Sequence, residues 1–199
     1  MNFQALDSQI LLFINHALAT PALDIVMPAL SGQGYLLVIP FLLAMLAQGM
    51  KRTDQAGKTY FASAVWTLVI ACLAVYLAEW ADDAIKVAVA RARPCRAIEG
   101  IRLIVPCPKT YSMPSGHAMN SFAFAAPLFF LTRAYIIPFG RLYPLVLASL
   151  IAFSRIYLGV HYPTDVLVGT ILGGSIGLAL SMLYQVIGTE EIVKRKNKS

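Results

Sequence analysis

The stretch YFASAVWTLVIACLAVYLAEW, residues 60–80, contains a single charged side chain, Glu79. A helix needs about 20 mostly apolar residues to cross the hydrocarbon core of a bilayer, and this stretch meets that requirement. Similar apolar runs occupy residues 35–48, 118–135, 142–158 and 166–187. The sequence therefore predicts an all-α fold, a polytopic transmembrane bundle of five to six spans that forms one domain over residues 1–199.

The composition supports a membrane protein. Hydrophobic residues make up 58% of the chain and charged residues 13%, whereas a soluble domain carries about a quarter charged residues. The net charge is +6, but the basic residues lie at the ends of apolar runs and not along one polar face. This pattern is typical of membrane topology and argues against a nucleic-acid partner.

Basic side chains also predict the orientation in the membrane. They gather in three places that five spans would put on one side, which the positive-inside rule makes cytoplasmic. They are Lys51, Arg52, Lys58, Arg133, Arg141, Lys194, Arg195, Lys196 and Lys198. The segments 86–113 and 155–165 would then face the outside of an inner (cytoplasmic) membrane.

The first thirty residues allow two interpretations. Apolar residues from Phe3 to Ala17 recur at helical spacing and polar residues cluster on another face, which favours an amphipathic helix lying in the membrane interface. A sixth crossing that includes residues 23–30 stays open. His16 belongs to the amphipathic helix, and we expect it to have no catalytic part.

Two smaller features concern packing and cross-linking. Gly169, Gly173, Gly174 and Gly177 lie at spacings near four in the last apolar run, which favours close approach of a neighbouring helix. Cys72 lies in an apolar run and is expected to be buried. Cys95 and Cys107 share one loop, where they either form a disulfide or stay reduced, depending on the compartment.

The first of three polar clusters is Lys86, Arg93 and Pro94. Helical pattern continues past residue 80, so Lys86 and Arg93, nearly two turns apart, are expected on one helix face. Asp82 precedes Lys86 by four residues and can pair with its ammonium, and Pro94 should end the helix. The alternative is ordinary interfacial cations whose charged ends reach toward water.

The second cluster is Pro114-Ser115-Gly116-His117, directly before an apolar run. Ser115 is a natural N-cap, and the free N–H groups of a helix start bind phosphate readily. Gly116 would let an anion approach the backbone, with His117 beside it. The alternative is a capped helix with an incidental histidine.

The third cluster is Ser154-Arg155, His161 and Asp165. Arg155 lies near the end of an apolar span, where a cation is costly and is a candidate for function. Asp165, in the first turn of the last helix, can reach back to the His161 imidazole and fix its tautomer. Together the three clusters put three cations, two histidines and a serine cap on one membrane face.

In order and spacing, these clusters resemble the signature of the type 2 phosphatidic acid phosphatase superfamily. That signature is a lysine and six residues before Arg-Pro, then Pro-Ser-Gly-His, then Ser-Arg, five residues, His, three residues and Asp. The resemblance implies a small bacterial membrane lipid phosphatase with its site near the periplasmic surface. Its substrate could be undecaprenyl pyrophosphate, phosphatidylglycerophosphate, phosphatidic acid or lipid A.

The resemblance also implies roles for these residues. His161 would be the nucleophile that forms a phosphohistidine, Asp165 would orient it, and His117 would protonate the leaving oxygen and then activate water. The phosphate would be bound by Lys86, Arg93, Ser115, Gly116 and Arg155. With three cations present, neither a metal nor another cofactor is expected.

Two alternatives remain at this point. A phosphotransferase of the same family would pass the phosphate to a second lipid in place of water. A non-enzymatic transporter would use intramembrane charges to line a path, but here the charges gather at one face. The oligomeric state stays open.

Overall fold

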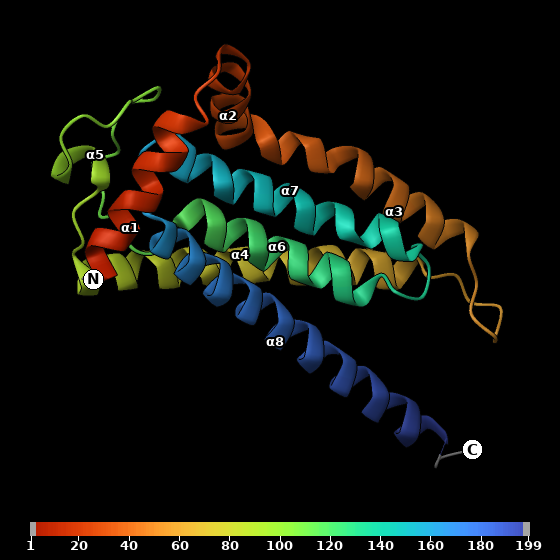
Figure 1. Cartoon of the computed structure of the whole chain (residues 1–199). Coiled ribbons are helices and arrows are strands. Elements are labelled where there is room, and N and C mark those ends of the chain that lie inside the picture. The colour runs from red at the N-terminus through yellow and green to blue at the C-terminus, as the bar shows by residue number, and fades with distance from the viewer. Residues whose placement is uncertain (1–2, 197–199) are drawn as a thin grey trace.

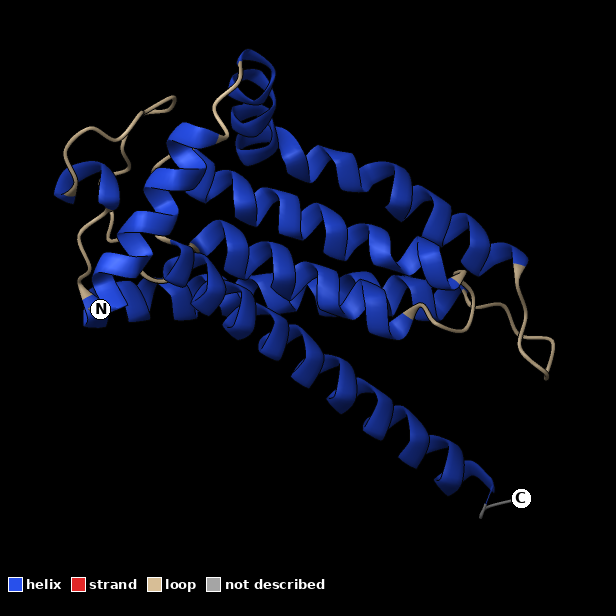
Figure 2. Ribbon diagram, in the orientation of Figure 1, coloured by secondary structure: helices blue, strands red, loops and turns tan. Residues whose placement is uncertain are grey.

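The computed structural model describes residues 3–196, and the side chains of residues 4–188. Helices dominate this part of the chain, and its only β pairing is an isolated bridge between Thr53 and Thr59. The predicted all-α fold is therefore confirmed. Long helices run lengthwise along the molecule, and short elements gather at one end (Figures 1 and 2).

Five helices run along the length of the bundle (Figure 1). They are α3 (Ile39–Lys51), α4 (Phe61–Val89), α6 (Gly116–Leu131), α7 (Pro138–Tyr157) and α8 (Pro163–Lys196). α6 packs against α4, α7 and α8 and so forms the middle of the bundle. α8 leaves the other helices toward its C-terminus (Figure 1).

Four segments of the described chain are long and apolar enough to span a bilayer: 21–51, 61–97, 138–157 and 163–188. The protein is therefore a multi-pass membrane protein. α6 covers the predicted run 118–135 with only 16 helical residues, a rise of about 24 Å at 1.5 Å per residue.

The N-terminal residues form the predicted helix and lie across one end of the bundle (Figure 1). It consists of α1 (Phe3–Leu12) and a π-helical turn, η1 (Phe13–Ala17). Its apolar side chains Leu6, Ile10 and Phe13 are exposed, whereas Asp7 and Asn15 are buried. Asp7 and Asn15 therefore point into the protein, as does the apolar Leu11, which is also fully buried.

Residues 23–30 do not form a long separate helix. They belong to α2 (Pro21–Gln33), which continues through the 3-10 turn η2 (Gly34–Val38) into α3. α2 begins with Thr20 as N-cap, whose hydroxyl accepts from the N–H of Leu23 at 3.3 Å. The whole stretch 21–51 counts as one candidate span.

The contact between α6 and α8 depends on missing side chains. A Cβ atom added at Gly173 would lie 1.9 Å from the carbonyl oxygen of Met119 in α6. At Gly169 it would lie 2.6 Å from the carbonyl oxygen of Ser115, the N-cap of α6, and at Gly177 2.6 Å from that of Ala123. The predicted packing role is confirmed for these three glycines. It is wrong for Gly174, where an added Cβ would meet nothing within 4 Å.

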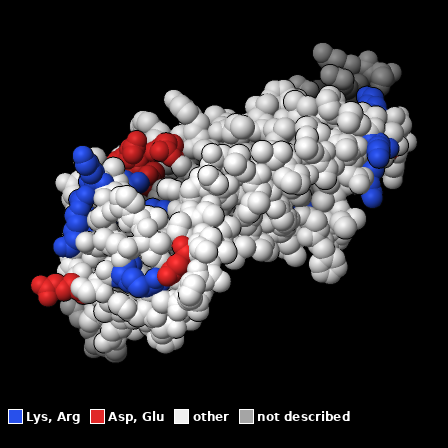
Figure 3. Space-filling model, turned by 90° about the horizontal axis from the view of Figure 1, so that it is seen from above, with Lys and Arg blue, Asp and Glu red and all other residues white. Residues whose placement is uncertain are grey.

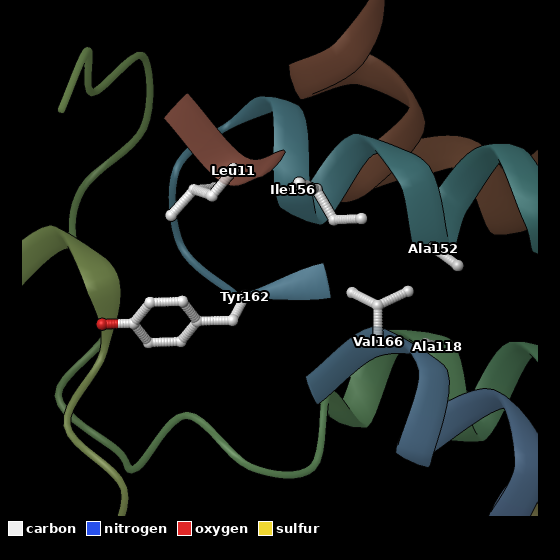
Figure 4. Close-up of a cluster of buried hydrophobic side chains, with 6 residues drawn as sticks. All are labelled: Leu11, Ala118, Ala152, Ile156, Tyr162 and Val166. Atoms are coloured by element: carbon white, nitrogen blue, oxygen red, sulfur yellow. The ribbon is translucent and has the colours of Figure 1, made fainter. Parts of the chain in front are cut away.

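Near the site end, α1, α6, α7 and α8 meet in one apolar cluster. Leu11 of α1 and Ile156 of α7 lie opposite Ala118 of α6 and Val166 of α8 (Figure 4). This cluster fixes the starts of α6 and α8 against the end of α7.

The surface follows the expected membrane pattern. On the face shown in Figure 3, Asp and Glu lie at one end together with Lys and Arg, Lys and Arg lie at the other end, and a broad, almost entirely white band separates the two ends. Cys72 lies exposed on α4, so the prediction that it is buried is wrong. The reason is that α4 lies at the edge of the bundle, where apolar residues such as Trp66 and Tyr76 are also exposed. The side chains of Lys194, Arg195, Lys196 and Lys198 lie outside those that the structure describes.

Candidate active site

The predicted site residues lie where four helix ends meet. Lys86 is in the last turn of α4, His117 in the first turn of α6, and Arg155 in the last turn of α7. His161 lies in the connection to α8, and Asp165 in the first turn of that helix.

Arg93 reaches the site by a route that differs from the prediction. α4 ends at Val89 because Ala90 adopts the left-handed conformation, with φ of 49°. Arg93 itself is extended, as expected for a residue before proline. It therefore does not share a helix face with Lys86. Pro94 begins a short helix, α5 (Pro94–Ala97), instead of ending one.

The Arg93 guanidinium is buried and fixed on several sides. Nε and Nη2 donate to the carbonyl oxygen and the hydroxyl of Thr110, both at 2.8 Å, and Nη1 donates to the carbonyl oxygen of Val160 at 3.0 Å. Nη1 also lies 2.8 Å from Nε2 of His161. A planar guanidinium with this many partners has a defined orientation.

His161 is 2% exposed. Because an arginine has only donors, the contact from Arg93 identifies Nε2 of His161 as the nitrogen with a free lone pair. Nδ1 faces Oδ2 of Asp165 at 3.6 Å, which is longer than a hydrogen bond. Burial lowers the pKa of His161 to about 3, with further lowering by the charges of Arg93 and Arg155 and an opposing contribution from Asp165. The imidazole is therefore neutral at physiological pH, with its unprotonated Nε2 toward Arg93.

The start of α6 presents groups that fit an anion. Ser115 is the N-cap of α6, as predicted, but its hydroxyl makes no capping bond and is buried without a partner among the described residues. A Cβ at Gly116 would lie 2.7 Å from Oδ2 of Asp82 and 3.2 Å from Nζ of Lys86. Gly116 thus allows the Lys86–Asp82 ion pair, which forms as predicted, to lie directly against the helix start.

His117 and Arg155 lie close to Lys86 and Arg93. The charges of Arg155, Lys86 and Arg93 all act on the ring of His117. Nη1 of Arg155 contacts the hydroxyl of Ser31 in α2, while its Nε is buried and has no partner within the described chain. The structure therefore brings together all the predicted phosphate-binding residues, with unpaired polar atoms on Ser115 and Arg155.

Asp165 is held by partners that sequence reasoning missed. Its carboxylate accepts from the hydroxyl of Ser112 at 2.5 Å and the N–H of Tyr162 at 2.9 Å. Arg91 donates to the other oxygen at 2.5 Å. The sequence could have indicated Arg91, because it is a second cation two residues before Arg93. It could not have indicated Ser112 or Ser31, since a single serine in a loop or helix has no characteristic pattern.

The loop between α5 and α6 is tied down at two points. Cys95 and Cys107 form a disulfide, so the first of the two predicted alternatives holds. Arg102 donates to both carboxylate oxygens of Asp24 at 2.8 Å, and its N–H donates to the side chain of Asn15 at 2.9 Å. His16 is exposed, and its Nε2 lies 3.1 Å from the carbonyl oxygen of Gly100, away from the cluster.

Residues 64–188 match the family model described as the PAP2 superfamily. An undecaprenyl-diphosphatase of Sulfolobus acidocaldarius is 32% identical over 149 residues, which cover 75% of this chain and 65% of that protein. A lipid A 4'-phosphatase of Bacteroides thetaiotaomicron is 26% identical over 174 residues, 85% of this chain and 72% of that protein. The chain thus spans about two thirds of the length of these relatives.

Among solved structures, a transmembrane PAP2-type phosphatidylglycerolphosphate phosphatase from Bacillus subtilis has the same fold. The superposition has a TM-score of 0.66 at 24% identity and covers 92% of this chain and 87% of the other. The helices of this chain are therefore arranged as in a solved PAP2-type membrane protein.

Proposed function

Because the chain belongs to the PAP2 superfamily, we propose that it is an integral membrane phosphatase that removes a phosphate group from a lipid through a phosphohistidine on His161. The observation that carries the proposal is the contact between Arg93 and Nε2 of His161. It presents a neutral, buried imidazole next to a fixed cation, with Arg155 and the α6 start close by. A nucleophile beside several cations is what phosphoryl transfer requires.

Each residue has a defined part in the first step. Lys86, Arg93 and Arg155 neutralise the phosphate oxygens, and the Ser115 hydroxyl and the Gly116 N–H donate to them. Nε2 of His161 attacks phosphorus while the bond from phosphorus to the lipid oxygen breaks. His117 gives its proton to that leaving oxygen. Asp165 stabilises the positive charge on the phosphorylated imidazole.

The second step reverses the role of His117. It takes a proton from a water molecule, whose oxygen attacks phosphorus and breaks the bond to Nε2. Inorganic phosphate and free His161 result. Neither step draws on a cofactor, because the three cations supply the charge that a metal ion would otherwise provide.

A lateral cavity supports a lipid substrate. It has a volume of about 500 Å³ and apolar walls contributed by η2, α3, α4, α6 and α7. Asn120 and Ile151 line it, and each lies one helical turn from a site residue, His117 and Arg155 respectively. An acyl or prenyl chain in this cavity would leave its phosphate at the site, as pockets that are mostly apolar with a few polar groups commonly do.

The membrane and its side are also part of the proposal. The loops at the end opposite the site carry Lys51, Arg52, Lys58, Arg133 and Arg141. The positive-inside rule makes that end cytoplasmic, which puts the site at the periplasmic or outer face of the inner membrane. Labelling of Ala56→Cys and Glu99→Cys in a Cys72→Ser background tests this. An impermeant thiol reagent added to intact cells should modify the cysteine at position 99 and not that at position 56, and the reverse pattern would refute the orientation.

The activity is tested by phosphate release from purified, detergent-solubilised protein. The panel is undecaprenyl pyrophosphate, phosphatidylglycerophosphate, phosphatidic acid and lipid A. At least one should be hydrolysed by the parent, and His161→Ala should abolish release while His16→Ala leaves it unchanged. Release by His161→Ala at the parent rate would overturn the nucleophile, and release from no substrate would favour a transporter. A second lipid that accepts phosphate in preference to water would identify a phosphotransferase.

A further inference from the structure

The buried face of the N-terminal helix contributes a carboxylate to the site end. Asp7 of α1 has a side chain that is 1% exposed. Its Oδ2 accepts from Nη2 of Arg91 at 2.6 Å. Burial of a carboxylate costs free energy unless the group is paired and hydrogen-bonded, as Asp7 is.

Arg91 bridges this carboxylate to Asp165. Nη1 donates to Oδ1 of Asp165 at 2.5 Å and to the hydroxyl of Thr164 at 2.8 Å. Nη2 donates to Oδ2 of Asp7. The guanidinium carbon lies 3.9 Å above the ring centre of Tyr162. The arginine thus holds two buried carboxylates with one planar fork, a geometry that lysine cannot reproduce.

Asp7 also holds the start of α8. Its Oδ1 accepts from the N–H of Thr164 at 3.1 Å and its Oδ2 from the hydroxyl of Thr164 at 2.5 Å. Asp165, the next residue, is 0% exposed and faces Nδ1 of His161. Asp7 therefore determines where the backbone before Asp165 lies, and through Arg91 it also determines where the Asp165 carboxylate lies.

We infer that Asp7 and Arg91 are positioning residues of the reaction, which act through Asp165 on His161. This inference rests on the proposed function and adds a part of the chain, residue 7, that lies outside the matched family region 64–188. Asp7, Arg91 and Asp165 together carry a net charge of −1. That net charge balances the positive imidazole formed when His161 is phosphorylated. Arg91 alone against Asp165 would leave no net negative charge there.

The inference predicts that substitution of Asp7 or Arg91 lowers kcat much more than it changes KM. Asp7→Asn keeps the size of the side chain but makes the cluster neutral, so phosphorylation of His161 becomes slower. We expect kcat to fall about tenfold, equivalent to about 1.4 kcal/mol, and KM to change by less than about threefold. Arg91→Lys should lower kcat at least as much, because it loses one of the two carboxylate contacts.

The experiment compares these variants with Ser8→Ala in detergent. Ser8 is the next residue on α1, and its hydroxyl donates to the carbonyl oxygen of Gln4 at 2.9 Å within the helix, so this control should keep parental kinetics. Rapid-quench measurement of phosphoenzyme formation, divided by the fraction of active sites from the burst, separates slow chemistry from loss of folded protein. Inhibition by orthovanadate should be unchanged, because the phosphate-binding residues are intact.

The possible results test the inference about Asp7 and Arg91 separately from the proposed phosphatase function. If Asp7→Asn or Arg91→Lys forms the phosphoenzyme at the parental rate per active site, the inference is wrong while the phosphatase stands. If the parent releases no phosphate, the proposed function itself fails. The double variant Asp7→Asn, Arg91→Lys should be no slower than the slower single variant. Losses that multiply would show that the two residues act independently, which also contradicts the inference.

Discussion

Nη1 of Arg93 lies 2.8 Å from Nε2 of His161, although the two residues are 68 positions apart in the chain. This contact occupies the nitrogen that we propose as the nucleophile toward phosphorus. Under this proposal a phosphate group comes between the two side chains, with the Arg93 charge on one side and the lone pair of Nε2 on the other. The Arg93–His161 pair is therefore a place where an anion would find a fixed positive charge next to an unprotonated nitrogen.

The first prediction concerns this arginine. Arg93→Lys keeps the charge but loses the simultaneous bonds to Thr110 and Val160, so kcat/KM should fall by about a hundredfold, as for removal of one transition-state donor. Arg96→Lys is the matched control, because Arg96 is exposed and donates to the carbonyl oxygen of Pro108 at 2.6 Å. Steady-state phosphate release measures both. Equal losses in the two variants would mean that general charge, and not the Arg93 geometry, matters.

The second prediction concerns pH. The pKa of His161 is lowered to about 3 in the folded protein, first of all by burial, whereas it is about 6.5 in the unfolded chain. Between these values the unfolded state binds a proton that the folded state does not, so stability is lost as pH falls below about 6.5. His161→Asn should therefore lose less stability than the parent between pH 7.5 and pH 5.

Thermal unfolding at those two pH values provides the measurement. His16→Asn is the control, because His16 is exposed at the surface of η1 and should leave the parental pH dependence in place. If His161→Asn and the parent lose the same Tm, the imidazole does not stay neutral on folding.

The third prediction concerns the glycines of α8. Gly173→Ala would place a methyl group 1.9 Å from the Met119 carbonyl oxygen, so α6 and α8 must separate. We expect a loss of about 1–3 kcal/mol in stability, the usual range for overpacking. Gly174→Ala meets nothing within 4 Å and should be neutral or slightly stabilising, because alanine is the better helix former. Comparison of the two midpoints in detergent checks this, and equal effects would contradict the close approach of the helices.

The fourth prediction concerns metal ions. If Lys86, Arg93 and Arg155 supply the charge that neutralises the phosphate oxygens, as we propose, phosphate release should persist in EDTA. Orthovanadate, which resembles the transferring phosphoryl group, should inhibit it. The assay is phosphate release with and without chelator at fixed substrate. Activity that disappears on chelation and returns with Mg²⁺ would rule out a site that works with cations of the protein alone.

The sequence alone determined much of the fold and of the candidate site. Long apolar runs require helices in a bilayer, because unpaired backbone groups are too costly there. The residue types and spacing of the three clusters therefore predicted Lys86, His117, Arg155, His161 and Asp165 at one end of the bundle. Local rules also predicted Ser115 as the N-cap and the Lys86–Asp82 pair, since these depend on residues four or fewer positions apart.

The tertiary structure decided what local rules cannot reach. Helical spacing put Arg93 on the face of Lys86, but the chain leaves the helix at Ala90 and returns Arg93 to His161 by an extended path. Asp7 and Ser31 became part of the site only because α1 and α2 fold across its end. Contacts between residues far apart in sequence depend on how whole helices pack, and that packing is set by the sum of many apolar contacts and not by any one motif.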